Sequence, residues 1–430
     1  MRIQQLKLLI NSKLSKDLVY VFISQLVIML SAFLINKIVS VRLGVEGFAQ
    51  YSLIKKSAYL FNSIMTGGML VALPRYLARH TRKTTNIGRY LFPSSIFVFL
   101  FYIVVLGFVI LIFPDLFSQL LFNEEGSYSL LLITFFMALA QSYGMIIYAF
   151  FQGHGNFKRY NRVQMIFNLV LLLLSLITSS NIFRMIFVSH LGVLVYLFFI
   201  TKKGNIIHPL KSFNRKIIWK TSEILAFYGF PRMLQRLVLL AQNIFPVIII
   251  LHRLSLTDVG IFSAGIAITS LISPIFGMTG GVLLQRVSLY YKNNKIKLIN
   301  KVLSIALLSY LLLSSIGVLL IVSFKGFLIP LMFSKEFNAV ESVLWIFAIS
   351  LVPQCIFQLL CNPIDAMSKI PFNLITISVS TIVLFTIILF ANSIYDCALA
   401  YLISNIVTAF LTLIFWVFVM RKAVKSNNDT

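Results

Sequence analysis

The 430-residue chain is 59% hydrophobic and only 11% charged, whereas a soluble domain carries about 25% charged residues. This composition excludes a soluble globular protein. Uncharged apolar runs of about 20 residues recur from end to end, which predicts an all-α, polytopic integral membrane protein. The net charge of +25 must be compatible with that class.

Twelve membrane-spanning helices are predicted. The first follows a basic, amphipathic N-terminus and has no small-residue cleavage site after it, so it is expected to remain as a membrane span. Each predicted helix is long enough to cross about 30 Å of hydrocarbon. In chain order the spans are 18–41, 48–73, 90–113, 128–151, 163–180, 185–201, 224–251, 261–284, 302–324, 342–361, 373–391 and 397–420.

The segments that connect these spans alternate in charge. Of the 37 lysines and arginines, 27 lie in the two termini and the loops on one side, and five lie on the other side. Eight of the twelve acidic residues lie on that other side. The positive-inside rule therefore places the basic set, with both termini, in the cytoplasm. The net positive charge is explained by topology, and we expect no nucleic-acid partner.

The two halves of the chain resemble each other in sequence. At an offset of 213 residues, Gly47 aligns with Gly260, and the tetrapeptide MTGG at 65–68 aligns with MTGG at 278–281. Because this offset corresponds to six spans, both halves have the same orientation in the membrane. Transporters built from parallel repeats have this arrangement.

A second match supports the repeat: PDLFSQLLFN at 114–123 resembles PLMFSKEFN at 330–338. The repeat predicts two pseudo-symmetric six-helix bundles. We expect an N-terminal lobe at 1–201 and a C-terminal lobe at 224–430, joined by a basic cytoplasmic linker at 202–223.

The second span contains two adjacent lysines, Lys55 and Lys56, in otherwise apolar sequence. Measured from Gly47 at 1.5 Å per residue, Lys55 lies about 12 Å along the helix. Polar side chains recur at steps of three and four around it, which predicts one polar helix face. The face consists of Tyr51, Lys55, Tyr59, Asn62 and Thr66.

The seventh span has a similar polar face, and Arg232 is expected about 13 Å from its inner end. The face consists of Tyr228, Arg232, Gln235, Gln242 and Pro246, flanked by Arg236 and Asn243.

Charges at the centre of a membrane helix cost about 2.5–3.5 kcal/mol each, and no acidic residue lies well inside a predicted span to pair with these cations. We therefore expect an aqueous, cationic cavity between the two halves. A cavity of this kind suits an anionic cargo such as a phosphate. The predicted cavity cations are Lys55, Lys56, Arg232 and Arg236.

Structural explanations of the same residues stay open. Lys55 and Lys56 are also compatible with a broken helix whose ends reach water. Arg232 and Arg236 are also compatible with the inner interface, where they would bind lipid headgroups. His190 is interpreted as a core histidine, and the glycine pairs that begin at Gly67 and Gly280 as points of close packing or bending.

The sequence has no signature of an enzyme: it lacks a glycine-rich phosphate loop, HExxH and a membrane-embedded aspartyl pair. Cys355, Cys361 and Cys397 lack the spacing of metal ligands. We therefore predict no catalytic residues, no cofactor and no metal.

The segment SVRLGVEGFAQYSL at 40–53 resembles a signature of polysaccharide-unit exporters. These are the Wzx-type O-antigen flippases of the multidrug/oligosaccharidyl-lipid/polysaccharide (MOP) superfamily. Ala49 stands where that family more often has glycine. The matching residues are Leu43, Gly44, Gly47, Phe48, Tyr51 and Ser52.

This resemblance implies a MATE-like fold and a flippase of the bacterial inner membrane. The implied cargo is an undecaprenyl-diphosphate-linked oligosaccharide, which crosses from the cytoplasmic to the periplasmic leaflet by alternating access. Implied partners are this lipid-linked oligosaccharide, the membrane lipids and a polysaccharide polymerase. The residues expected to contact sugars are Tyr59, Asn62, Gln235 and Asn243.

Two alternatives are less consistent with the sequence. A cation-coupled multidrug exporter on the same fold would need an intramembrane carboxylate, which no predicted span contains. A membrane-bound glycosyltransferase or polymerase would need a large catalytic loop, and the longest outer loop, at about 324–341, has no acidic pair of that kind.

Overall fold

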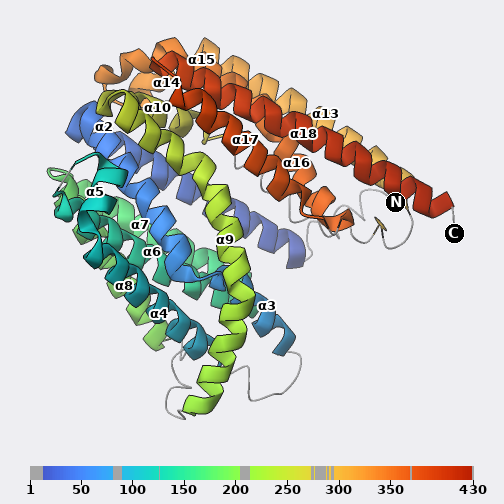
Figure 1. Cartoon of the computed structure of the whole chain (residues 1–430), viewed down its shortest axis with the longest axis horizontal. Coiled ribbons are helices and arrows are strands. Elements are labelled where there is room, and N and C mark those ends of the chain that lie inside the picture. Colours follow the sequence, from blue (N-terminus) through green and yellow to red (C-terminus); the bar gives the residue numbers. More distant parts are fainter. Residues whose placement is uncertain are drawn as a thin grey trace. The chain divides into compact units, whose positions relative to one another are not determined.

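The computed structural model describes residues 13–80, 90–124, 126–203, 214–272, 276, 287, 290–291, 295–368 and 370–428. These residues form helices joined by short turns, and no strand occurs among them. The predicted all-α fold is therefore confirmed. The chain divides into two compact units, Met1–Leu237 and Val238–Thr430, and Figure 1 shows the helices of each.

In the first unit, α6, α7 and α8 lie side by side, and α2 packs against α6 and α7 (Figure 1). α9 begins in this unit and ends in the second one. The helices are α2 (Lys13–Thr66), α3 (Met69–His80), α4 (Leu91–Ile112), α5 (Pro114–Phe122), α6 (Tyr128–Gly153), α7 (Phe157–Thr178), α8 (Ile182–Lys203) and α9 (Arg215–Arg253).

In the second unit, α16 and α17 pack along α18, and α13 packs against α16. The helices are α10 (Leu256–Thr269), α13 (Ile296–Ser323), α14 (Lys325–Met332), the 3₁₀ helix η3 (Lys335–Ala339), α15 (Val340–Ile349), α16 (Leu351–Met367), α17 (Phe372–Leu389) and α18 (Ile394–Asn428).

Glycine 44 divides α2 into the two predicted spans. Its φ of 70° and ψ of −167° are not helical. This backbone conformation is adopted almost only by glycine, because a Cβ atom would clash with the backbone. Ile28 and Tyr59 line the same cavity, although 31 residues of straight helix would separate them by about 46 Å. α2 therefore folds back on itself at Gly44, and its two halves run beside each other.

Gly67 and Gly68 separate α2 from α3, with φ of +52° and +73°. A Cβ atom on Gly68 would overlap the backbone carbonyl of Gly229 in α9, within the same unit. The prediction that this glycine pair is a point of bending and close packing is confirmed. The corresponding pair, Gly280 and Gly281, lies outside the described residues.

Ten helical segments in the described part of the chain are long and apolar enough to cross a membrane. They correspond to eleven of the twelve predicted spans, because α2 contains parts of two. The predicted span 48–73 is interrupted at Gly67 and Gly68, where α2 ends and α3 begins. The remaining span, 261–284, begins in α10 and continues beyond the described residues. Several helices begin before the first residue of the predicted span. α9, for example, begins at Arg215 rather than at 224.

The repeat is visible in the order of the helices, since α4 and α13 are each followed by a short helix, α5 and α14. The pairing of 114–123 with 330–338 is nevertheless out of register with these helices. Pro114 is the first residue of α5, whereas Pro330 lies in the last turn of α14. Residues 278–281 lie outside the described part.

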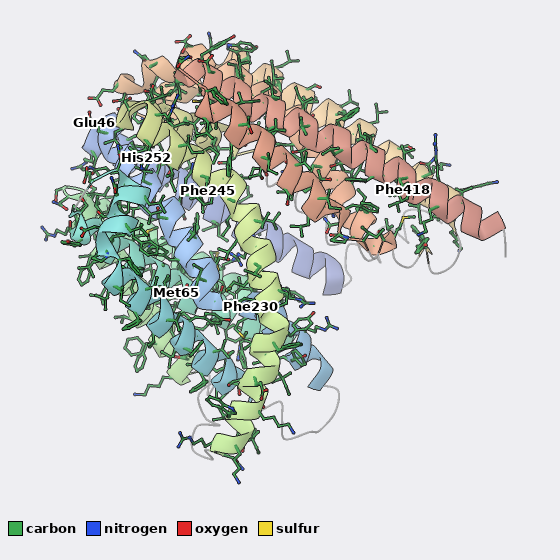
Figure 2. The ribbon with its side chains drawn as sticks, in the orientation of Figure 1. Glu46, Met65, Phe230, Phe245, His252 and Phe418 are labelled. Carbon is green, nitrogen blue, oxygen red and sulfur yellow. The ribbon has the colours of Figure 1, made fainter. Side chains whose placement is uncertain are left out.

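The outer faces of several helices are apolar and exposed. Val104 and Leu111 of α4 are 68% and 78% exposed. Phe418 on α18 (Figure 2) is 52% exposed. Exposed apolar faces of this extent are unfavourable in water but stable in contact with the hydrocarbon chains of lipids. With the ten apolar segments, they identify a multi-pass membrane protein.

The N-terminal part of α9 is tied to the first unit. The Ser94 hydroxyl donates a hydrogen bond to the carbonyl of Ile218 at 3.2 Å, and the Ser222 hydroxyl donates to the carbonyl of Ser94 at 3.3 Å. The division into compact units consequently falls at Leu237, within α9. The lobes predicted at 1–201 and 224–430, with their linker, stay a prediction.

Candidate functional site

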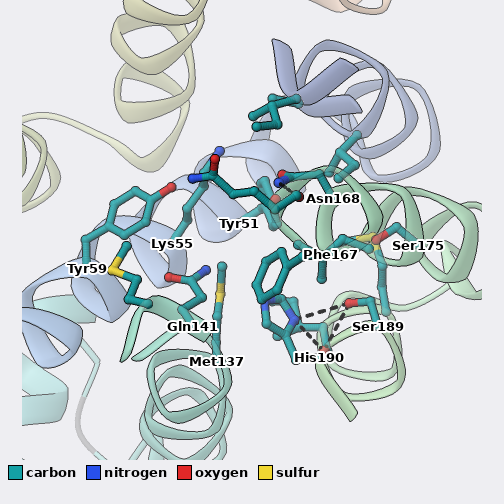
Figure 3. Close-up of a pocket in the computed structure, with 18 of the residues that line it drawn as sticks. Tyr51, Lys55, Tyr59, Met137, Gln141, Phe167, Asn168, Ser175, Ser189 and His190 are labelled. Carbon is teal, nitrogen blue, oxygen red and sulfur yellow. Dashed lines mark hydrogen bonds between the residues drawn. The ribbon is translucent and has the colours of Figure 1, made fainter. Parts of the chain in front are cut away.

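A cavity of about 290 Å³ lies inside the first unit. It is lined by side chains from both halves of α2 and from α6, α7 and α8 (Figure 3). Lys55 is the one lysine or arginine among the residues that line it, and none of those residues is an aspartate or a glutamate. The cavity therefore has a largely apolar and aromatic lining that contains several polar side chains and one positive charge.

Three residues of α2 form the cationic wall of this cavity: Tyr51, Lys55 and Tyr59. Their spacing of four residues places them on one helix face, as the sequence predicts. The Lys55 ammonium lies 5.7 Å from the centroid of the Tyr51 ring, which is within cation–π range. Figure 3 shows both tyrosine rings beside Lys55.

Four other residues that line the cavity have a buried polar atom without a hydrogen-bond partner among the described residues. The atoms are Gln141 Oε1, Tyr148 Oη, Gln164 Oε1 and His190 Nε2. A buried polar group left unpaired costs about 1–3 kcal/mol, and such groups in native proteins bind water or a ligand. Each of the four atoms has less than 1 Å² of accessible surface, so a polar ligand in the cavity would reach them only after small movements of the lining side chains.

His190 is held on one side only. Its Nδ1 lies 2.9 Å from the carbonyl oxygen of Ile186 and 3.2 Å from the Ser189 hydroxyl, and Figure 3 shows the Phe167 ring beside it. In a neutral imidazole, Nδ1 carries the proton that the carbonyl accepts, so Nε2 is an acceptor. His190 is buried, as expected of a core histidine, but its Nε2 has no partner among the described residues.

Lys56 and Asn62 do not line this cavity. The Lys56 ammonium is buried, and no hydrogen-bond partner for it lies in the described part of the chain. Asn62 is fully buried, and neither polar atom of its amide has a described partner. Asn62 lies about 10 Å further along α2 than Lys55, so the predicted polar face extends past the end of the cavity.

The remaining predicted residues lie in different places. Arg236 Nη2 is 3.8 Å from the sulfur of Met145, which lines the cavity, so Arg236 is next to the site but not in its lining. The side chain of Gln235 lies outside the described part. Asn243 belongs to the second unit and lines a separate cavity there.

Arg232 has an aromatic partner. Its guanidinium carbon is 3.4 Å from the centroid of the Tyr228 ring, and Nη1 donates a hydrogen bond to the Tyr228 carbonyl at 2.7 Å. Arg75 stacks on the same ring at 4.6 Å and donates to the Tyr228 hydroxyl. Arg232 therefore has an aromatic partner in place of an acidic one. Its position beside Arg75, in the basic segment 74–89, favours the alternative of an interfacial arginine.

Sequence reasoning missed the contributions of α6, α7 and α8, namely Gln141, Gln164 and His190. A signal was present, since amides and histidine are rare in apolar spans and mark functional positions. The sequence did not show that these three residues face Lys55, because that depends on how four helices pack. The described residues contain no group of three or more His, Cys, Asp or Glu side chains placed to hold a metal.

The sequence matches the model of a known family, described as polysaccharide biosynthesis protein, over residues 14–284. This match covers more than half of the chain. The chain belongs to this family. No curated protein matches it.

Solved structures share the fold of this polysaccharide biosynthesis protein. A MATE-family multidrug resistance transporter of the MOP superfamily, in an inward-facing conformation, superposes with a TM-score of 0.78 at 14% identity, covering 93% of this chain and 96% of that one. The lipid II flippase MurJ, in an inward closed conformation, gives 0.70 at 16% identity, covering 96% and 91%. The predicted MATE-like fold is confirmed.

A third similar structure is a MOP superfamily transporter from Pyrococcus furiosus Vc1, for which reverse polarity of the binding pocket suggests a different function. It has a TM-score of 0.64 at 14% identity, covering 94% of each chain. At such identities the likeness shows the fold of this polysaccharide biosynthesis protein, and its chemistry must come from its own side chains.

Proposed function

We propose that this protein is a flippase for an anionic, lipid-linked oligosaccharide. The cargo would be an undecaprenyl-diphosphate-linked glycan unit, such as an O-antigen unit. It would be moved from the cytoplasmic to the periplasmic leaflet of a bacterial inner membrane by alternating access. The observation that carries this proposal is the cavity of the first unit, which holds Lys55, several unpaired polar atoms and no acidic side chain.

The chemistry of the cavity suits a diphosphate. The Lys55 ammonium has three N–H donors and the hydroxyls of Tyr51 and Tyr59 each have one, whereas phosphate oxygens are acceptors. Hydrogen bonds from charged donors to phosphate are about twice as strong as neutral ones. The polyprenyl tail would stay in lipid, beside the apolar faces of the helices.

The other predicted cations would assist at a distance. Arg236 contacts Met145 at the cavity, and Lys56 lies one residue from Lys55 with no described partner. We retain both in the proposed path of the diphosphate. Arg232 would act at the edge, with Arg75. Tyr59, Asn62, Gln235 and Asn243 remain the proposed sugar contacts, and the cavity between the two halves stays a prediction.

The multidrug alternative is less consistent with these side chains. A cationic drug exchanged for protons or sodium would need a carboxylate in its path, and the described residues that line the cavities of the two units include none. A polymerase partner and the absence of enzymatic activity also stay proposals.

The decisive experiment is complementation in a host whose own copy of the gene is deleted. Lys55→Gln should lower surface polysaccharide at least about tenfold, because one charge-assisted hydrogen bond contributes about 1.5–3 kcal/mol. Lipid-linked units should accumulate on the cytoplasmic side. Lys55→Arg should retain more activity. Lys220→Gln is the matched control, since Lys220 lies exposed on α9.

Membrane levels of all variants must be matched by immunoblot. If Lys55→Gln restores the polymer as well as the wild type does at equal abundance, the cavity does not handle the diphosphate. Full activity of a variant with Lys55, Lys56, Arg232 and Arg236 all replaced by alanine would reject the cationic path as a whole.

A further inference from the structure

A second cavity, of about 260 Å³, lies inside the second unit. It is lined by the C-terminal part of α9, by α10 and the residue after it, and by α16 and α18. None of the described residues that line it is charged. Its walls consist of amides, hydroxyls, an isoleucine and two aromatic side chains, which contrasts with the cationic cavity of the first unit.

Two glutamines in this cavity have their amide N–H donors engaged by the protein. Gln242 Nε2 lies 3.5 Å from Ser380 Oγ and 3.4 Å from Ser404 Oγ. Both serine hydroxyls donate their own hydrogens to backbone carbonyls, of Ile377 and Ser380 respectively. The serines can therefore only accept from Gln242, which fixes the orientation of its amide.

Gln354 is oriented in the same way. Its Nε2 donates to the Tyr401 hydroxyl at 2.9 Å and to Ser350 Oγ at 3.3 Å. The Ser350 hydroxyl donates to the carbonyl of Phe347, so it too is an acceptor towards Gln354. Asn405 Nδ2 donates to the backbone carbonyl of Tyr401 at 2.8 Å.

These bonds leave Gln242 and Gln354 with only their side-chain oxygens to offer a ligand. Donors remain elsewhere in the lining: the Tyr401 hydroxyl, which accepts from Gln354, keeps its own hydrogen, and Asn243 Nδ2 has one N–H bonded, to the Leu239 carbonyl. Gln242 and Gln354 have each used both N–H donors, so each retains only acceptor capacity. An anion would find no positive charge among the residues that line the cavity, which is unfavourable. A ligand that matches must bring several donors and no negative charge.

The size of the cavity decides between the remaining ligand classes. A monatomic cation needs a small cage of oxygens at 2.0–2.6 Å, usually with carboxylates. About 260 Å³ is several times the volume of about 30 Å³ that one water occupies in the liquid. Phe357 adds an aromatic face to the lining. These features fit a ring with hydroxyl donors at its edge and C–H groups on its faces.

We propose that this cavity is a subsite for an uncharged sugar ring, such as a neutral hexose, 6-deoxyhexose or N-acetylhexosamine. The ring hydroxyls donate to the side-chain oxygens of Gln242, Gln354 and Asn405, and a ring face packs on Phe357. The choice of a sugar rests on the proposed function, in which the cargo is a glycan.

Saturation-transfer NMR on the full-length protein in nanodiscs tests this subsite. The probes are glucose, galactose, rhamnose and N-acetylglucosamine, with glucuronate as the charged comparison. We expect transfer to at least one neutral sugar and none to glucuronate. Asn405→Leu should weaken binding about fivefold, the effect of one hydrogen bond. Asn338→Leu, an exposed change of the same type in η3, should bind like the wild type.

Phe357→Ala is a second variant, for use if Asn405→Leu fails to fold. It removes the aromatic face of the subsite and leaves the hydrogen bonds of the amides in place. Saturation transfer detects binding with millimolar dissociation constants. The subsite is overturned if no neutral sugar gives a signal, or if the signal is the same in the wild type and in both folded variants. Preferential binding of glucuronate overturns it as well. Lys55→Gln should leave sugar binding intact. Failure of the diphosphate path is therefore distinguishable from failure of this subsite.

Discussion

Lys55 and Lys56 are neighbours in sequence, but their ammonium groups have different surroundings. Lys55 lines the cavity of the first unit beside Tyr51 and Tyr59, whereas the Lys56 ammonium is buried away from it without a described partner. Successive residues on a helix point about 100° apart, which explains the difference. Of the two, only Lys55 lines this cavity, and burial of the Lys56 ammonium imposes a cost on folding.

That cost leads to a prediction at the scale of one residue. Lys56→Met should raise the thermal unfolding midpoint of the purified protein by a few degrees, because it removes a buried unpaired group worth about 1–3 kcal/mol. The midpoint is measured in detergent by fluorescence. Lys220→Met, on the exposed face of α9, should change it little. A lower midpoint for Lys56→Met would show that the ammonium is stabilised in the folded protein.

At the scale of elements, close contacts of backbone position the helices around the site. α2 folds back at Gly44, which brings residues of both its halves to one cavity. The Gly67–Gly68 turn then brings the start of α3 against α9 at Gly229. Such approaches require glycine on both sides, because a Cβ atom would occupy the space of the opposing backbone.

Gly68→Ala should therefore lower the free energy of unfolding by more than the backbone strain at residue 68 alone would. A side chain at positive φ costs about 1–2 kcal/mol, and the overlap with the Gly229 carbonyl adds about 1–3 kcal/mol. Gly126→Ala is the matched control, since Gly126 has φ of +74° and a Cβ atom there would have no neighbour within 4 Å. Both variants share the cost of positive φ, so we expect the unfolding midpoint and the membrane abundance to fall clearly further for Gly68→Ala than for Gly126→Ala. Equal behaviour of the two variants would contradict the close packing.

At the scale of the whole molecule, the charge distribution of the loops predicts an orientation in the membrane. α6 is flanked by Gly126 on one side and Gly155 on the other, and a Cβ atom at either position would meet no neighbour within 4 Å. The positive-inside rule predicts that the loop at 123–127 lies outside and the basic segment at 152–162 lies inside. The two glycines are thus suitable reporters of opposite sides.

Single cysteines at these positions test the orientation. In a background with Cys355, Cys361 and Cys397 replaced by alanine, Gly126→Cys should react with an impermeant maleimide in intact spheroplasts. Gly155→Cys should react only after the membrane is permeabilised. The reverse labelling pattern would invert the topology and, with it, the proposed direction of transport.

The sequence by itself determined the class of fold and the membrane spans. Hydrophobic length and charge asymmetry are properties of contiguous residues, so they can be read along the chain. Helical periodicity also placed Tyr51, Lys55 and Tyr59 on one face, because the three lie on the same helix. The family match agrees with the resemblance carried by residues 40–53.

Only the tertiary structure decided which polar residues meet. Gln141, Gln164 and His190 come from three different helices, and their convergence on Lys55 depends on the packing of α6, α7 and α8 around α2. The partner of Arg232 is the Tyr228 ring on its own helix. Sequence reasoning considered only acidic partners and therefore missed it. Side-chain direction, burial and hydrogen bonding arise from contacts between distant residues, and a linear pattern does not contain them.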